Sequence, residues 1–137
     1  MPDKGGKVIK VKDGDSIVLL EKGNRQTEIR LAHIDAPELH QDFGRKAKTF
    51  LSDMVAGEHV TYSIYEEEDR YGRIVAVVLL NDTLNINKEM VKNGYAWHFK
   101  RYSNNFQYHM LERNARKDEL GLWVDPDPLE PWEYRRK

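Results

Sequence analysis

The sequence has no cysteine among its 137 residues, which excludes disulfide bonds and zinc sites with thiolate ligands. It also has no apolar run that approaches the length of a membrane-spanning helix. An excess of one charge is lacking too, because the formal net charge at pH 7 is −1. A protein that holds nucleic acid over a wide surface is usually strongly basic. The near-neutral balance therefore favours a small, local cationic site.

The composition is that of one well-solvated globular domain, with 39% hydrophobic and 33% charged residues. Residues 1–6 contain no apolar segment, so no signal peptide is expected there, and they are predicted to form a flexible lead-in. Residues 7–137 are predicted to form the domain, with 124–137 as its tail. Nothing in this pattern identifies the compartment, and we expect a monomer without membrane contact.

Two kinds of periodicity divide the chain. Alternation or short apolar runs predict strands at the following ranges: 8–11, 17–20, 27–34, 60–65 and 74–80. The turn signals at 13–15 and 23–24 would join the first three strands into a meander. Helical spacing predicts helices over 43–55, about 85–93 and about 104–119.

The order of these elements indicates the fold. Five strands with a helix between the third and fourth are the outline of an OB-fold barrel, so the fold class is α+β, a five-stranded barrel with three α-helices. Asn85 is expected to cap the second helix, and Tyr108 should face inward from the third. From Trp123 onward, three prolines predict neither regular helix nor strand, and Trp123 and Trp132 should hold this tail against the body.

Carboxylates lie beside arginines in two places next to predicted strand ends. Arg30, Asp35 and Glu38 fall within nine residues, and Asp-Arg-Tyr-Gly-Arg occupies 69–73. The turn at 13–15 adds two more carboxylates. To hydrolyse a phosphodiester, an enzyme must neutralise the charge of the phosphate, activate and orient a water molecule, and stabilise the transition state. These side chains are suited to all three tasks.

These segments resemble the signature motifs of the staphylococcal nuclease family. The matching stretches are Asp-Gly-Asp-Ser at 13–16, Arg30 with Ile-Asp-Ala-Pro-Glu at 34–38, and 69–73, in the family's order and approximate spacing. Downstream, Asn-Gly-Tyr-Ala at 93–96 and Gly-Leu-Trp at 121–123 also resemble the family. The resemblance implies a calcium-dependent, sugar-non-specific nuclease that hydrolyses DNA and RNA with an activated water and leaves 3′-phosphate ends.

The resemblance also implies a role for individual residues. It implies that Ca²⁺ is bound by Asp15, Asp35 and the carbonyl of Ala36. The implied catalytic residues are Arg30, Arg73 and Glu38, with Glu38 as the general base. The implied substrate-binding residues are Arg70, Tyr71 and Tyr102. Calcium favours such all-oxygen ligands, and guanidinium groups pair well with phosphate.

The sequence departs from the family at two of these places. Ala36 stands where the best-known member has threonine, and Lys100 stands where an aromatic partner of Tyr102 would stack on a base. A catalytically silent nucleic-acid-binding module is the alternative function, and a protein-interaction barrel is a further one. None of the five proposed catalytic and metal-binding side chains is missing, which favours the enzyme.

Other readings of single residues stay open at this stage. Arg73 also fits a surface ion pair with the acidic run 66–68. The five histidines show no metal-binding spacing, and His40 is of interest because it lies near Glu38. The basic residues 113, 116 and 117 are typical of a solvated helix face.

Overall fold

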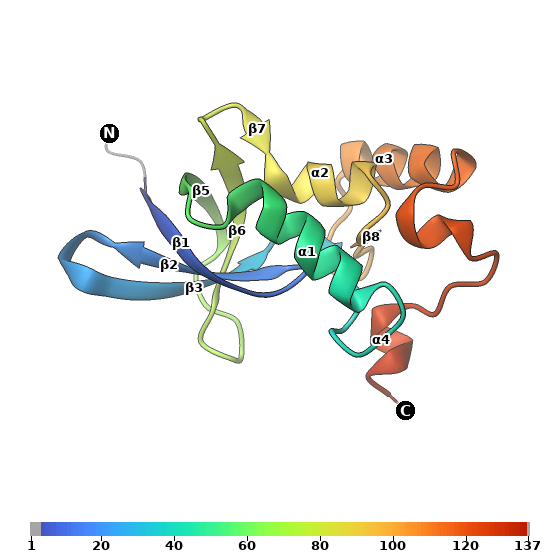
Figure 1. Cartoon of the computed structure of the whole chain (residues 1–137), viewed down its shortest axis with the longest axis horizontal. Coiled ribbons are helices and arrows are strands. Elements are labelled where there is room, and N and C mark those ends of the chain that lie inside the picture. The colour runs from blue at the N-terminus through green and yellow to red at the C-terminus, as the bar shows by residue number, and fades with distance from the viewer. Residues whose placement is uncertain (1–3, 137) are drawn as a thin grey trace.

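The computed structural model describes residues 4–136, which fold around a closed β-barrel (Figure 1). The barrel strands are β1 (Lys4–Asp13), β2 (Ser16–Glu21), β3 (Arg25–Leu31), β5 (His59–Glu66) and β6 (Ile74–Leu80). They are ordered β3-β2-β1-β5-β6, and the parallel pairing of β3 with β6 closes the sheet. The predicted five-stranded OB-type barrel and its α+β class are confirmed.

Three helices surround the barrel as expected. They are α1 (Gly44–Val55), α2 (Ile86–Lys92) and α3 (Phe106–Lys117). The helix α1 follows the third barrel strand and packs against β1, and α2 packs against both β6 and α3 (Figure 1). As predicted, the Asn85 side chain caps α2 by accepting a hydrogen bond from the backbone N–H of Lys88.

The core is continuous from the barrel into the helices. Ile17, Leu19 and Ile29 from the barrel, Leu51 from α1 and Met90 from α2 are all fully buried. A second buried cluster joins Trp97 and Trp123. Trp97 lies on β8 (Trp97–His98), a two-residue strand that pairs with β4 (Ile34–Asp35).

The third predicted strand is interrupted, which corrects the range 27–34. After β3 the chain turns at residues 32–33, where His33 has a positive φ of 71°, and β4 then leaves the barrel to pair with β8. The periodicity missed this break because both sides of the turn are apolar and buried. The break gives Asp35 a different direction from that of the barrel strand.

The two ends of the described chain also differ from expectation. Residues 4–6 of the predicted lead-in belong to β1, where they pair with β5; residues 1–3 lie outside the described part. The tail is not wholly irregular, since it forms the 3₁₀ helix η2 (Gly121–Val124) and the one-turn helix α4 (Pro131–Tyr134). Proline at the first helical position is compatible with a helix because its missing N–H would have no partner there.

Further short elements were not predicted. Besides the β4–β8 pair, the structure has the 3₁₀ turn η1 (Lys22–Asn24) and the strand β7 (Leu84–Asn85), which extends the sheet beyond β6. Among residues 4–136, no helix is long and apolar enough to cross a membrane.

Candidate active site

The guanidinium of Arg30 contacts both of the carboxylates that are predicted to bind a metal. Its Nη1 lies 3.5 Å from Oδ2 of Asp15, and its Nη2 lies 3.4 Å from Oδ1 of Asp35. Arg30 also donates to the carbonyl of Leu31 at 2.8 Å, which fixes the position of the guanidinium. Asp15 and Asp35 are both buried, at 7% and 0% exposure, so their charges depend on this partner.

The register of the barrel brings these residues together. Arg30 pairs with Ser16 on one side and with Val75 on the other, so it lies beside the β1–β2 turn that carries Asp15. That turn can approach the chain after β4 because residue 14 is glycine: a Cβ there would come within 2.8 Å of the Ala36 side chain. The backbone N–H of Ala36 then donates to Oδ2 of Asp15 at 2.8 Å.

The two buried aspartates respond differently to the same surroundings. Burial alone would raise the pKa of Asp15, but Arg30, a hydrogen bond from Asp13 and the Ala36 N–H outweigh it and lower that pKa. Burial, with repulsion from Asp15, raises the pKa of Asp35 to about 6. Burial and the same repulsion raise the pKa of Asp13 to about 8. The site therefore contains more carboxyl groups than cationic side chains.

Glu38 lies on a compact loop between β4 and α1. Its backbone N–H donates to Oε1 of Gln41 at 3.0 Å, and its carbonyl accepts from the N–H of Gln41 at 2.9 Å. Residue 44 must be glycine for this loop to rest on the start of α1, because a Cβ there would come within 1.8 Å of the Glu38 carbonyl oxygen. The carboxylate of Glu38 is thus held near Asp35, with a side chain that is one-third exposed.

Arg73 ends the tight turn before β6. Its Nε lies 2.9 Å from Oδ2 of Asp69, so Arg73 pairs with Asp69 and not with the acidic run 66–68. The other carboxylate oxygen of Asp69 accepts from the backbone N–H groups of Tyr71 and Arg73, which fixes the turn. Arg73 also helps to lower the pKa of Asp15, so its charge reaches the aspartate pair.

The predicted substrate-binding residues lie at the exposed side of this turn. Tyr71 and Tyr102 are 68% and 63% exposed. The Arg70 guanidinium lies over the Tyr71 ring, 5.2 Å from its centre, and donates to the Tyr71 hydroxyl. Tyr65 links this side to Tyr102, since its hydroxyl donates to the Tyr102 carbonyl at 3.2 Å. Lys100 points elsewhere and pairs with the buried Glu112 at 2.9 Å.

Arg135, in the tail, is a site residue that the sequence did not reveal. Its Nη2 lies 2.6 Å from Oδ2 of Asp35, its Nη1 lies 3.3 Å from Oδ1 of the same residue, and Nη1 also donates to Glu38. The partners are 100 and 97 residues away in sequence, and no local pattern relates residues so far apart. Arg135 ends the stretch Pro-Trp-Glu-Tyr-Arg at 131–135, which by itself indicates no partner for the arginine.

Several polar residues have structural partners instead of a place in this site. His33 and His98 both hydrogen-bond the hydroxyl of Ser103, and His40 is exposed. The basic residues 113, 116 and 117 of α3 are exposed, as expected of a solvated helix face, and the Arg116 guanidinium also lies 4.2 Å from the ring centre of Trp123. Among residues 4–136, no three histidine, aspartate or glutamate side chains form a metal-binding group.

A closed OB-type barrel that carries arginines beside buried carboxylates is an arrangement suited to a hydrolase that acts on phosphate esters. Comparison with known families agrees with that class. The model described as "Staphylococcal nuclease homologue" matches residues 28–125. The chain therefore belongs to the staphylococcal nuclease family.

Individual relatives cover most of the chain. An "Uncharacterized endonuclease" of Haemophilus influenzae is 45% identical over 131 residues, which is 96% of this chain and 72% of the relative. An "Uncharacterized endonuclease" of Escherichia coli is 40% identical over 135 residues, or 98% and 87% of the two chains. A "Micrococcal nuclease" of Shigella flexneri is 41% identical over 145 aligned positions, or 98% and 82%.

Proposed function

We propose that this chain is a calcium-dependent, sugar-non-specific nuclease that hydrolyses DNA and RNA and leaves 3′-phosphate ends. The observation that carries the proposal is the position of Arg30 between Asp15 and Asp35, with Glu38 on the adjacent loop. The names of the relatives, endonuclease and micrococcal nuclease, agree with this activity.

The arginines would bind and stabilise the phosphate. A guanidinium keeps its charge at any physiological pH and offers two parallel donors that match two phosphate oxygens. Arg30 is held by the Leu31 carbonyl and Arg73 by Asp69, so neither loses much side-chain entropy when the phosphate arrives. Glu38 would orient the attacking water or accept its proton.

The donor set fits calcium. Asp15 and Asp35 lie within 3.5 Å of the same guanidinium, and both supply only oxygen ligands, as would the carbonyl of Ala36. Calcium would neutralise the phosphate and lower the pKa of a nearby water. The raised pKa of Asp35 also agrees with a cation site, because buried carboxylates in excess are relieved by positive charge.

Tyr71, Arg70 and Tyr102 would contact the nucleotides next to the cleaved bond. Exposed aromatic rings stack on any base, which agrees with weak sequence preference. With Lys100 bound to Glu112, Tyr102 would stack without an aromatic neighbour at that position.

Digestion of single-stranded DNA and RNA under a calcium titration tests the proposal. Cleavage should rise with calcium and stop when a chelator is in excess. The product ends should resist polymerase extension until a phosphatase removes the 3′-phosphate. Binding of DNA without cleavage at any calcium concentration would indicate the silent binding module, and undiminished digestion in chelator would exclude the calcium role.

A further inference from the structure

The tail places a third arginine on the carboxylates that are proposed to bind the metal. Arg135 contacts both oxygens of Asp35 and one oxygen of Glu38. Its side chain is 42% exposed, while that of Asp35 is fully buried. Arg30 also contacts Oδ1 of this carboxylate, at 3.4 Å. Asp35 is therefore paired with two guanidinium groups.

This position does not depend on the ion pair alone. Trp132 stacks on Phe99 with ring centres 5.5 Å apart and packs edge-on against Trp97, which is paired with Asp35 across β4 and β8. Gln41, next to the Glu38 loop, donates to the carbonyl of Leu129. These contacts hold the tail against the site up to the start of α4, and Arg135 follows directly after that helix.

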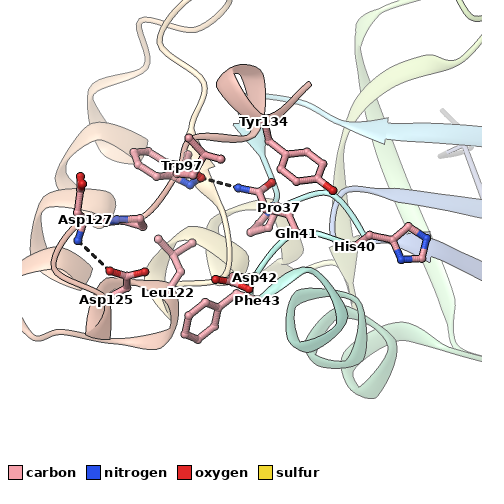
Figure 2. Close-up of a pocket in the computed structure, with 12 residues that line it drawn as sticks. Pro37, His40, Gln41, Asp42, Phe43, Trp97, Leu122, Asp125, Asp127 and Tyr134 are labelled. Atoms are coloured by element: carbon pink, nitrogen blue, oxygen red, sulfur yellow. Dashed lines mark hydrogen bonds between the residues drawn. The ribbon is translucent and has the colours of Figure 1, made fainter. Parts of the chain in front are cut away.

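The tail nevertheless covers the Glu38 loop only in part. A pocket of about 290 Å³ lies between the loop and the tail (Figure 2). Its lining includes Pro37, Gln41 and Phe43 from the loop and Leu129 and Tyr134 from the tail. The Arg135 side chain is itself partly exposed, so it can turn outward by rotation about its own bonds. Trp132 would keep its stacking contact during that rotation.

The charges at the site favour such a movement when a divalent cation binds. Asp15, Asp35 and Glu38 pair with Arg30 and Arg135, which leaves one net negative charge. Without Arg135 the same group carries two negative charges, the complement of a divalent cation. With Arg135 in place, the cation would meet a second guanidinium on its own ligand Asp35.

We propose that Arg135 competes with the metal ion for Asp35 and Glu38, and thereby sets the calcium concentration at which the enzyme becomes active. This inference rests on the proposed function, because it takes Asp35 as a calcium ligand. In the metal-free protein Arg135 occupies the carboxylates; when calcium binds, the guanidinium withdraws, and Glu38 is freed to face the substrate.

Calorimetric titration of the metal-free protein with calcium alone tests the competition. Arg135→Gln should bind calcium about tenfold more tightly than the original chain, because the metal no longer displaces a charge-assisted pair. Arg136→Gln is the matched control: it removes an equal charge from the next residue, which pairs with Glu133 and not with the site. Its calcium affinity should stay unchanged.

A second measurement follows Arg135 directly. In ¹⁵N NMR spectra of the metal-free protein, the Nε–H signal of Arg135 should be resolved, and calcium should shift it toward the value of a free arginine. Arg135→Lys should give an intermediate calcium affinity, because lysine keeps the charge but contacts the carboxylates at one point. Unfolding curves of each variant confirm that the fold is retained.

The outcomes separate this inference from the proposed function. Calcium binding that is equal or weaker in Arg135→Gln than in the original chain, with the Arg136→Gln control normal, contradicts the competition and leaves the calcium-dependent nuclease standing. An Arg135 signal that calcium does not move contradicts it as well. Failure of every variant to bind calcium contradicts both.

Discussion

Arg30 contacts both aspartates that are proposed to bind calcium, so its loss should affect stability as well as turnover. In Arg30→Ala, Asp15 and Asp35 would remain buried without this cation, at a cost of about 2–4 kcal/mol in the free energy of unfolding. In Arg73→Ala the half-buried pair with Asp69 is lost, which costs about 1 kcal/mol or less.

Both variants should lose turnover by about 10²–10³-fold or more, since each removes charge stabilisation of the transition state. Urea unfolding without calcium and single-turnover cleavage measure the two effects. Arg30→Lys is the informative control, because lysine keeps the charge but lacks the two parallel donors of the guanidinium. Near-normal turnover in Arg30→Lys would show that a general charge effect suffices.

Glu38 acts either as the base or as the residue that orients the water, and the two roles differ in their pH dependence. Glu38→Gln keeps the shape of the side chain and should lower turnover by about 10²–10⁴-fold at neutral pH. If Glu38 is the base, this deficit should shrink at alkaline pH as hydroxide replaces it. An orienting role leaves the deficit nearly constant.

Both roles concern the calcium-bound enzyme, in which Arg135 is proposed to have released Glu38. Turnover of the original chain and of Glu38→Gln, measured from pH 6 to pH 10 at saturating calcium, decides between them. Unchanged turnover in Glu38→Gln at every pH would exclude both roles and direct attention to Asp13 or Asp69.

At the scale of the elements, much of the structure could be predicted from local pattern. The barrel strands, the cap at Asn85 and the turn at 13–15 follow from short-range rules. The β4–β8 pair could not be predicted, since Asp35 meets Trp97 across 62 residues and neither strand has more than two residues. Helix α4 begins with Pro131, and the prolines of the tail predict a break in helix, although proline is compatible with the first helical position.

The candidate site likewise combines residues that a local pattern predicts with one that depends on long-range packing. Arg30, Asp35 and Glu38 are close in sequence, so a local motif revealed them, and the structure brings Asp15 to them through the β1–β2 register. Arg135 depends on how the tail packs, through Trp132 on Phe99 and Trp97. Long-range packing of this kind leaves no periodic trace in one sequence.

The β4–β8 pair carries a pH-sensitive contact between elements. His33 and His98 flank the Ser103 hydroxyl, at 2.7 Å and 3.0 Å. Burial lowers the pKa of each, and nearby positive charge from Lys88 adds to this at His33. Histidines with lowered pKa values bind protons less readily in the folded state than in the unfolded state. Their contribution to stability is therefore complete above pH 6.5 and is lost as the pH falls below it.

We expect the free energy of unfolding to fall between pH 6.5 and pH 5 by more in the original chain than in a His33→Asn, His98→Asn double variant. Asparagine tolerates the positive φ of residue 33. Urea unfolding of both proteins without calcium gives the difference between their free energies of unfolding at each pH. Asp35 contributes in the opposite direction, but it does so in both proteins, so its contribution cancels in that difference. Parallel curves over this pH range would contradict the assignment.

At the scale of the whole molecule, a net charge of −1 means that substrate affinity comes from a few local cations. The proposed phosphate contacts are Arg30, Arg70 and Arg73, and each contact to a single strand contributes about 0.7 to the slope of log K against log salt. The affinity for single-stranded DNA should therefore fall with a slope of about −2, a weak dependence for a nucleic-acid-binding protein.

Arg70→Gln should reduce that slope by about 0.7 and weaken binding of all sequences alike, since Arg70 is exposed beside Tyr71 and reads no base in this proposal. Arg113→Gln is the matched control: it removes one exposed positive charge from α3, outside the proposed site, and should leave the slope unchanged. Fluorescence anisotropy of a labelled oligonucleotide, with a catalytically inactive Glu38→Gln background, gives the slopes. Equal slopes for Arg70→Gln and its background would remove Arg70 from the substrate contacts, and a reduced slope in Arg113→Gln would extend the binding surface onto α3.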